Sequence, residues 1–154
     1  MEYVLVKTLH VVSSTILFGT GIGSAFYMLL ASVQRDAGIA HFVIRRVVIA
    51  DWLFTTPAVI VQPATGVYLV HLAGFPLSST WLALSIALYV LAGACWLPVV
   101  WLQIRMRELA AEAAASGAPL PAAFRKCLRI WVALGIPAFV ALVVVFYLMV
   151  AKPA

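Results

Sequence analysis

The chain has 154 residues, of which 66% are hydrophobic and 10% are charged. Soluble domains carry roughly a quarter charged residues, so this composition excludes a water-soluble globular domain and indicates a protein that lies in lipid. The net charge of +5 does not point to nucleic acid as a partner, because the basic residues lie at the ends of apolar segments and in loops.

Long, continuous apolar runs dominate the sequence. Inside lipid every backbone polar group must be paired within the protein, so such runs predict spanning α-helices. We expect an all-α integral membrane protein, an antiparallel up-down four-helix bundle that forms one membrane domain over residues 1–154. The predicted helices cover residues 2–34, 41–73, 80–116 and 121–150.

The first predicted helix begins at the start of the chain and is expected to be retained. Its apolar stretch, Thr8 to Val33, is longer than the core of a signal peptide, and no basic segment precedes it. Thr15, Gly19 and Gly23 repeat every four residues. Such a row of small residues predicts that the backbone of another helix approaches closely.

Proline and glycine residues predict where the later helices bend and end. Pro57 and Pro63 predict kinks in the second helix. The third, over residues 80–116, would be about 55 Å long and would project beyond the bilayer. Gly117, Pro119 and Pro121 end it.

Lys and Arg are distributed unequally between the two sides of the expected bundle. Lys7 and Lys152 lie near the chain ends, and the loop at residues 74–79 has no basic residue. The other eight lie around the first and third loops: Arg35, Arg45, Arg46, Arg105, Arg107, Arg125, Lys126 and Arg129. The positive-inside rule therefore places these two loops in the cytoplasm and both termini on the non-cytoplasmic side, as in a multi-pass protein of a bacterial inner membrane.

Two histidines in the apolar segments are candidate metal ligands. Ionisable groups inside a span are costly and are functional candidates by default. His10 and His71 are expected at similar depth on adjacent antiparallel helices, an arrangement that suits the iron of haem b. Lys7 and Ser14, one turn to either side of His10, complete the expected cofactor site. The alternatives are a hydrogen bond from His10 to a neighbouring hydroxyl and an interfacial position for His71.

Asp51 is the acidic residue expected inside the cytoplasmic half of the second helix. A buried carboxylate is stable only when it is paired. We expect a structural salt bridge with Arg45, Arg46 or Arg105, which lie at the same end of the bundle. The alternative is a carboxylate that handles protons or anchors a substrate.

Three segments resemble known membrane proteins. Residues 7–12, KTLHVV, are similar to the start of HemJ-type and CopD-type bacterial membrane proteins. The resemblance to HemJ, an oxygen-independent protoporphyrinogen oxidase, implies that His10 is a haem ligand. Residues 50–57, ADWLFTTP, and 96–107, WLPVVWLQIRMR, resemble an uncharacterised family of predicted bacterial integral membrane proteins, which implies no particular activity.

These observations lead to three functional hypotheses. The first is a haem b protein of electron transfer or tetrapyrrole chemistry, with an open possibility of HemJ-like membrane oxidoreductase activity. The second is an accessory subunit of a larger membrane complex. The third is a module that binds or transports a small molecule or ion without haem, and transport by four helices would need a homo-oligomer. The sequence contains none of the common motifs of soluble enzymes.

Overall fold

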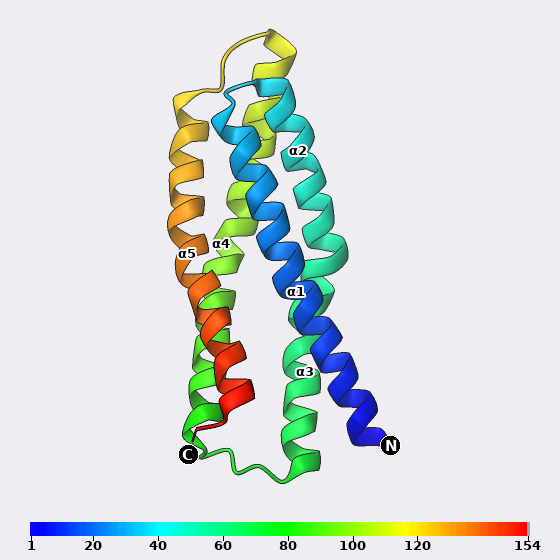
Figure 1. The fold of residues 1–154 in the computed structure, drawn as a ribbon. Helices are drawn as coiled ribbons and strands as arrows, with labels where there is room; N and C mark the ends of the chain where they lie inside the picture. Colours follow the sequence, from blue (N-terminus) through cyan, green and yellow to red (C-terminus); the bar gives the residue numbers. More distant parts are fainter. Residues whose placement is uncertain (154) are drawn as a thin grey trace.

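The structure is a computed structural model that describes residues 1–153, and these residues form an elongated bundle of helices (Figure 1). The elements are α1 (Glu2–Val33), α2 (Ala37–Ala50), the π-helical turn η1 (Asp51–Thr55), α3 (Thr56–Ala73), α4 (Thr80–Ser116) and α5 (Ala122–Ala151). Because α2, η1 and α3 are continuous, the chain makes four long helical passages.

All four passages are long and apolar enough to cross a membrane: Glu2–Val33, Ala37–Ala73, Thr80–Ser116 and Ala122–Ala151. This confirms the prediction of an all-helical protein with four spans. The second passage begins at Ala37, four residues before the predicted start, because the Asp36 side chain accepts a hydrogen bond from the Ile39 backbone N–H at 2.8 Å. Aspartate at this position satisfies a free donor of the first turn.

The second passage is not simply kinked at Pro57, as the sequence predicted. It contains the π-helical turn η1, in which the Thr56 N–H donates to the carbonyl of Asp51, five residues earlier. Pro57 follows directly. A proline has no N–H and its ring conflicts with the carbonyl four residues before it, so a widened turn at this point relieves the conflict.

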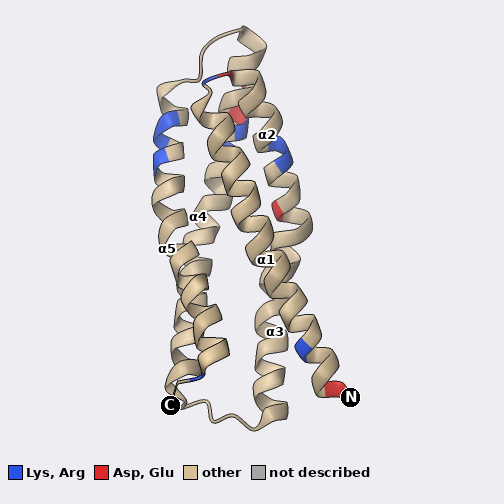
Figure 2. Ribbon diagram, viewed as in Figure 1, with Lys and Arg blue, Asp and Glu red and all other residues tan. Residues whose placement is uncertain are grey.

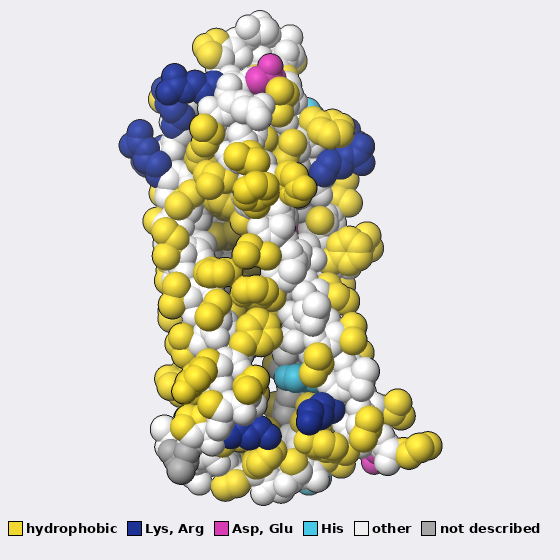
Figure 3. All heavy atoms as spheres, viewed as in Figure 1, with side chains coloured by type: hydrophobic (Ala, Val, Ile, Leu, Met, Phe, Trp, Pro, Cys, Tyr) yellow, Lys and Arg dark blue, Asp and Glu magenta, His cyan; other side chains and the backbone are white. Residues whose placement is uncertain are grey.

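The best-packed part of the bundle lies at the end that carries most of the basic residues (Figure 2). Its fully buried side chains include Met28, Ile44, Met106 and Phe124, which come from α1, α2, α4 and α5. Many large apolar side chains are exposed, and they cover much of the face that Figure 3 shows. In lipid this apolar exterior has no cost, so the packing of the interior decides how the helices associate.

Towards the other end, the helices associate mainly as two pairs, α1 with α3 and α4 with α5. Trp81 and Leu82 of α4 pack against Leu148 of α5 in a second small core. The Tyr89 hydroxyl of α4 donates to the Val59 carbonyl of α3 at 2.8 Å and joins the pairs. The separation of the pairs leaves a cavity at mid-height.

Candidate ligand-binding site

All four passages line one cavity of about 440 Å³. This volume lies within the range of about 300–1,000 Å³ that is typical of sites for small molecules. Glycine occurs in the wall on three helices, as Gly21, Gly93 and Gly135, and a Cβ atom at any of them would meet no other atom within 4 Å. These glycines therefore contribute to the free space rather than to close helix packing.

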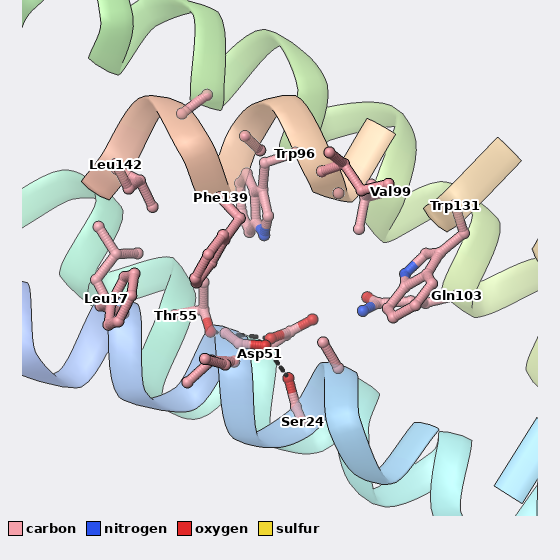
Figure 4. A pocket seen from close by; sticks show the side chains of 18 of the residues that line it. Leu17, Ser24, Asp51, Thr55, Trp96, Val99, Gln103, Trp131, Phe139 and Leu142 are labelled. Atoms are coloured by element: carbon pink, nitrogen blue, oxygen red, sulfur yellow. Dashed lines mark hydrogen bonds between the residues drawn. The ribbon is translucent and has the colours of Figure 1, made fainter. Parts of the chain in front are cut away.

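Asp51 supplies a buried carboxylate to this cavity. It is only 5% exposed and lies at the first position of η1. The Thr55 hydroxyl, which lies at the end of the same turn and is also buried, donates to Asp51 Oδ1 at 2.9 Å. Figure 4 shows both side chains directed from η1 towards the cavity. The π-turn thus presents a carboxylate and a hydroxyl together inside an apolar bundle.

Three polar atoms on the opposite wall are buried and have no hydrogen-bond partner among the described residues. They are Gln103 Oε1 and the indole nitrogens of Trp96 and Trp131. Figure 4 shows both indole nitrogens and the Gln103 amide directed into the space in front of Asp51. An unpartnered polar group in an apolar interior costs roughly 1–3 kcal/mol. A ligand with polar groups that hydrogen-bond to this wall would remove that cost.

Aromatic rings border the seam between α1 and α5. Phe18 of α1 stacks on Phe139 of α5 with ring centroids 5.4 Å apart, and it meets Phe146 edge-on at 5.2 Å. Phe18 and Phe139 also line the cavity. The surface in Figure 3 is hollowed along this seam, so the cavity faces the surrounding lipid through an aromatic border.

The expected salt bridge of Asp51 is not formed. In residues 1–153 the single ion pair joins Arg105 to Glu108, at 3.1 Å. Arg45 and Arg46 are exposed on α2, and the Arg46 guanidinium lies over the Phe42 ring, 5.2 Å from its centroid. The ion pair is absent because Asp51 faces the bundle interior, whereas Arg45, Arg46 and Arg105 are exposed on the outside.

His10 joins α1 to α3 through hydrogen bonds. Its Nδ1 lies 2.8 Å from the Thr65 hydroxyl, and its Nε2 lies 3.0 Å from the Gln62 side-chain nitrogen. The helices approach so closely here that a Cβ atom at Gly66 would lie 3.2 Å from the imidazole Cε1. One of the alternatives for His10, a hydrogen bond to a neighbouring hydroxyl, is therefore observed.

The other residues of the expected haem site do not gather around His10. His71 is exposed, six residues beyond Thr65 on α3, which is about 9 Å along a helix axis. Lys7 is exposed with its ammonium 5.7 Å from the Tyr3 ring centroid, and Ser14 donates to the Val11 carbonyl at 2.7 Å. No cluster of three or more potential metal ligands occurs within residues 1–153.

The structure does not bring His10 and His71 together as a pair of ligands, so haem binding stays a prediction. Both imidazole nitrogens of His10 have side-chain partners, and the ring lies close to the backbone of α3 at Gly66. The two histidines also lie at different depths. Tyr68, one turn before His71 on α3, is hydrogen-bonded to Glu2 at the start of α1. His10 lies two turns further along α1 and is level with Thr65 and Gln62 instead.

Four apolar passages around a lipid-facing cavity define a multi-span helical membrane protein. Within that class, the chain belongs to the family described as "Predicted integral membrane protein (DUF2269)", whose family model matches residues 4–153. No curated protein matches the chain, and no solved structure does. The match confirms the resemblance to a family of predicted integral membrane proteins, while the HemJ-type and CopD-type similarity and the bacterial origin stay predictions.

Sequence reasoning identified Asp51 as unusual but not the residues that surround it. Thr55 could have been found, because it lies four residues after Asp51 on the same helix. Gln103 is an isolated amide in an apolar segment, which indicates a site residue less clearly than the spacing of Thr55 from Asp51 does. Nothing in the sequence indicated that the Trp131 indole would face Asp51 from another helix.

Proposed function

We propose that this protein binds a small lipophilic amine within the membrane, in the cavity in front of Asp51. The observation that carries the proposal is a buried carboxylate with no cationic partner among the described residues, in a cavity with aromatic walls. A carboxylate in an apolar bundle needs a hydrogen-bonded cation or a proton. A protonated amine supplies both charge and N–H donors.

The polar atoms around Asp51 match such a head group. Gln103 Oε1 is a second acceptor without a donor, and an ammonium has N–H groups for both oxygens. The rings of Trp96 and Trp131 line the same space, where a cation is attracted to an aromatic face. Their indole N–H groups also favour a ligand with one acceptor, such as a hydroxyl, close to the amine.

The remainder of the cavity suits the hydrocarbon part of the ligand. Its wall there consists of aliphatic and aromatic side chains, including Leu17, Val59 and Leu142. Because the cavity faces the α1–α5 seam, a lipophilic molecule can reach it from the bilayer by displacing Phe18. The third of the sequence-based hypotheses, a small-molecule module without haem, is therefore the one we retain.

We also propose that the basic end of the bundle faces the cytoplasm. Figure 2 shows one end with most of the Lys and Arg residues and the other with few. The positive-inside rule relates such an asymmetry to orientation. Asp51 then lies in the cytoplasmic half of the membrane and His10 in the other half.

Binding of 1-aminoadamantane, an apolar cage with one ammonium, tests the proposed function. We expect saturable binding of the radiolabelled compound to the purified protein in nanodiscs, above that to empty nanodiscs. The neutral 1-adamantanol should compete poorly. Asp51→Asn should weaken binding by about tenfold or more, because it removes one partner of a buried charge pair.

Two glycine variants separate occupation of the cavity from partition into lipid. Gly93→Leu should abolish binding, because the added side chain enters the cavity, whereas Gly19→Leu should have no effect. Gly19 also has no atom within 4 Å of a Cβ position, but it does not line the cavity. Equal binding by wild type, Gly93→Leu and Asp51→Asn would overturn the proposal.

A further inference from the structure

A second hollow lies at the basic end of the bundle, between the end of α1 and the start of α5. It has a volume of about 540 Å³. Its apolar floor contains Leu120 and Phe124, both buried, together with the half-buried Leu128. Its polar wall contains three arginines: Arg35 from the α1–α2 turn, and Arg125 and Arg129 from α5.

The three arginines line the same hollow because of local geometry. Arg125 and Arg129 are one helical turn apart on α5 and therefore share a face. Arg35 has a φ of 61° and is the residue at which the chain leaves the direction of α1. Two segments that are far apart in the sequence thus contribute arginines to the wall of the hollow.

Among the described residues, none of these three arginines forms an ion pair with a carboxylate. The ion pair of Arg105 with Glu108 is the only one within the described chain, and neither residue lines the hollow. Asp36, next to Arg35, uses its carboxylate to cap α2 at the Ile39 N–H. Arg125 donates through Nη1 to the Leu120 carbonyl at 2.9 Å, which anchors its guanidinium and leaves its other N–H groups free.

We propose that this hollow binds the phosphate head group of an anionic phospholipid, with the start of an acyl chain on the apolar floor. Arginine guanidinium groups match phosphate oxygens in charge and geometry. Basic pockets between membrane helices on the cytoplasmic side are suited to anionic lipid head groups. This site is separate from the Asp51 cavity and does not depend on the proposed amine binding.

The position of the hollow favours a lipid over free phosphate. It lies where α1 ends at Val33 and α5 begins at Ala122, at the edge of two apolar spans. Lipid phosphates occupy this level of a bilayer. The hollow also joins its charged wall to the side chains of Leu120, Phe124 and Leu128, with which free phosphate makes no favourable contact.

Two groups of arginines at the same end provide a matched test. Figure 3 shows basic side chains over α5 and, separately, over α2. Arg125 and Arg129 line the hollow, whereas Arg45 and Arg46 are exposed on α2 and do not. Native mass spectrometry of the full chain, titrated with phosphatidylglycerol or with phosphatidylcholine, should show preferential retention of phosphatidylglycerol.

Replacing both hollow arginines, Arg125→Gln with Arg129→Gln, should weaken phosphatidylglycerol binding by about tenfold or more, because two charges near the head group are lost. Arg45→Gln with Arg46→Gln removes the same charge and should have little effect. If the first pair fails to fold, Arg35→Gln alone, in a loop, should show a smaller loss in the same direction.

An equal loss in the two double variants would overturn the proposal, because it would indicate only general attraction between the basic end and anionic lipid. Equal retention of phosphatidylcholine would also overturn it. Inorganic phosphate added alone should not compete with phosphatidylglycerol at millimolar concentration. Full displacement by inorganic phosphate would identify a free-phosphate site and contradict the assignment to lipid.

Discussion

Asp51 is better suited to binding a ligand than to stabilising the fold. Its carboxylate is buried, accepts a hydrogen bond from Thr55 and has no cationic partner within residues 1–153. A structural salt bridge would have made it a stabilising residue. Without one, an ionised Asp51 is a cost to the folded protein that a bound cation removes.

Asp51→Asn should therefore leave the ligand-free protein at least as stable as the wild type. Asparagine keeps the side-chain shape and an acceptor for Thr55 but removes the charge. Unfolding in detergent, followed by circular dichroism, should give an equal or higher midpoint. Loss of a buried salt bridge would instead cost about 3–5 kcal/mol, and a fall of that size would contradict our assignment.

Phe124→Ala provides the reference for this measurement. Phe124 is 1% exposed in the main core, and its truncation should cost about 3–5 kcal/mol. A clear fall in this variant, beside none in Asp51→Asn, shows that the assay detects a loss of packing.

At the scale of the elements, η1 decides what Asp51 can do. In a regular α-helix through Pro57, the turn that holds Asp51 and Thr55 would contain one residue fewer. The π-turn contains one additional residue, and its exposed members Trp52, Leu53 and Phe54 point outward while Asp51 and Thr55 are buried. Single π-turns inside α-helices occur frequently at functional sites, which agrees with the site proposed here.

Deletion of Leu53 should remove the π-turn and leave the bundle folded. The deletion converts the turn to α-helical geometry, so α2 and α3 keep the faces that they now bury. We expect the free energy of unfolding to fall by about 3 kcal/mol, because Pro57 then conflicts with the carbonyl four residues before it, while the loss of the lipid-facing Leu53 side chain itself costs little. We also expect loss of 1-aminoadamantane binding.

Deletion of Val67 is the matched control for this experiment. Val67 is exposed on α3, where the helix has no additional residue. Its loss rotates the following part of α3 by about 100° and should disrupt that part of the fold. If both deletions destabilise the protein equally, η1 is an integral part of the packing rather than a separable insertion.

At the scale of the whole molecule, the bundle has two distinct ends. The basic end contains the main core and the arginine-lined hollow, whereas the opposite end has two helix pairs and a small second core. The Asp51 cavity lies between them. The proposed route to this carboxylate runs from lipid through the aromatic border at Phe18 and Phe139.

The proposed orientation predicts different accessibility for two single cysteines. Both native cysteines, Cys95 and Cys127, are free and would first be replaced by alanine. Ser78→Cys lies in the α3–α4 loop, and Ser116→Cys lies at the end of α4. In intact cells of a bacterial expression host, a membrane-impermeant maleimide should label only Ser78→Cys.

Permeabilised cells serve as the control, because both cysteines should then react. Ser78 and Ser116 are both exposed, so burial does not prevent reaction of the cysteines that replace them. Labelling of Ser116→Cys but not of Ser78→Cys in intact cells would show the reverse orientation.

The number and approximate limits of the spans could be predicted from the sequence, because the length of an apolar run is a local property and the bilayer sets its scale. Local signals also predicted the ends of the helices: Gly74 and Gly117 terminate α3 and α4 in the left-handed conformation, with φ of 67° and 65°.

The side chains that meet inside the bundle could not be predicted in this way. His10 pairs with Thr65 and Gln62 rather than with His71, and the small-residue row at Gly19 and Gly23 has no neighbouring atom within 4 Å of a Cβ position. Both outcomes depend on how each helix is rotated about its axis. In a chain that is apolar on nearly every face, hydrophobic periodicity does not specify that rotation.

The amino-acid pattern was therefore enough to predict a membrane protein of four spans with one basic end and an unusual acidic residue. The folded bundle was needed to show that Asp51, Gln103 and Trp131 line the same cavity. The π-turn aims the carboxylate, and the divergence of two helix pairs leaves the space in front of it. Both depend on contacts between segments that are distant in the chain, which local patterns do not contain.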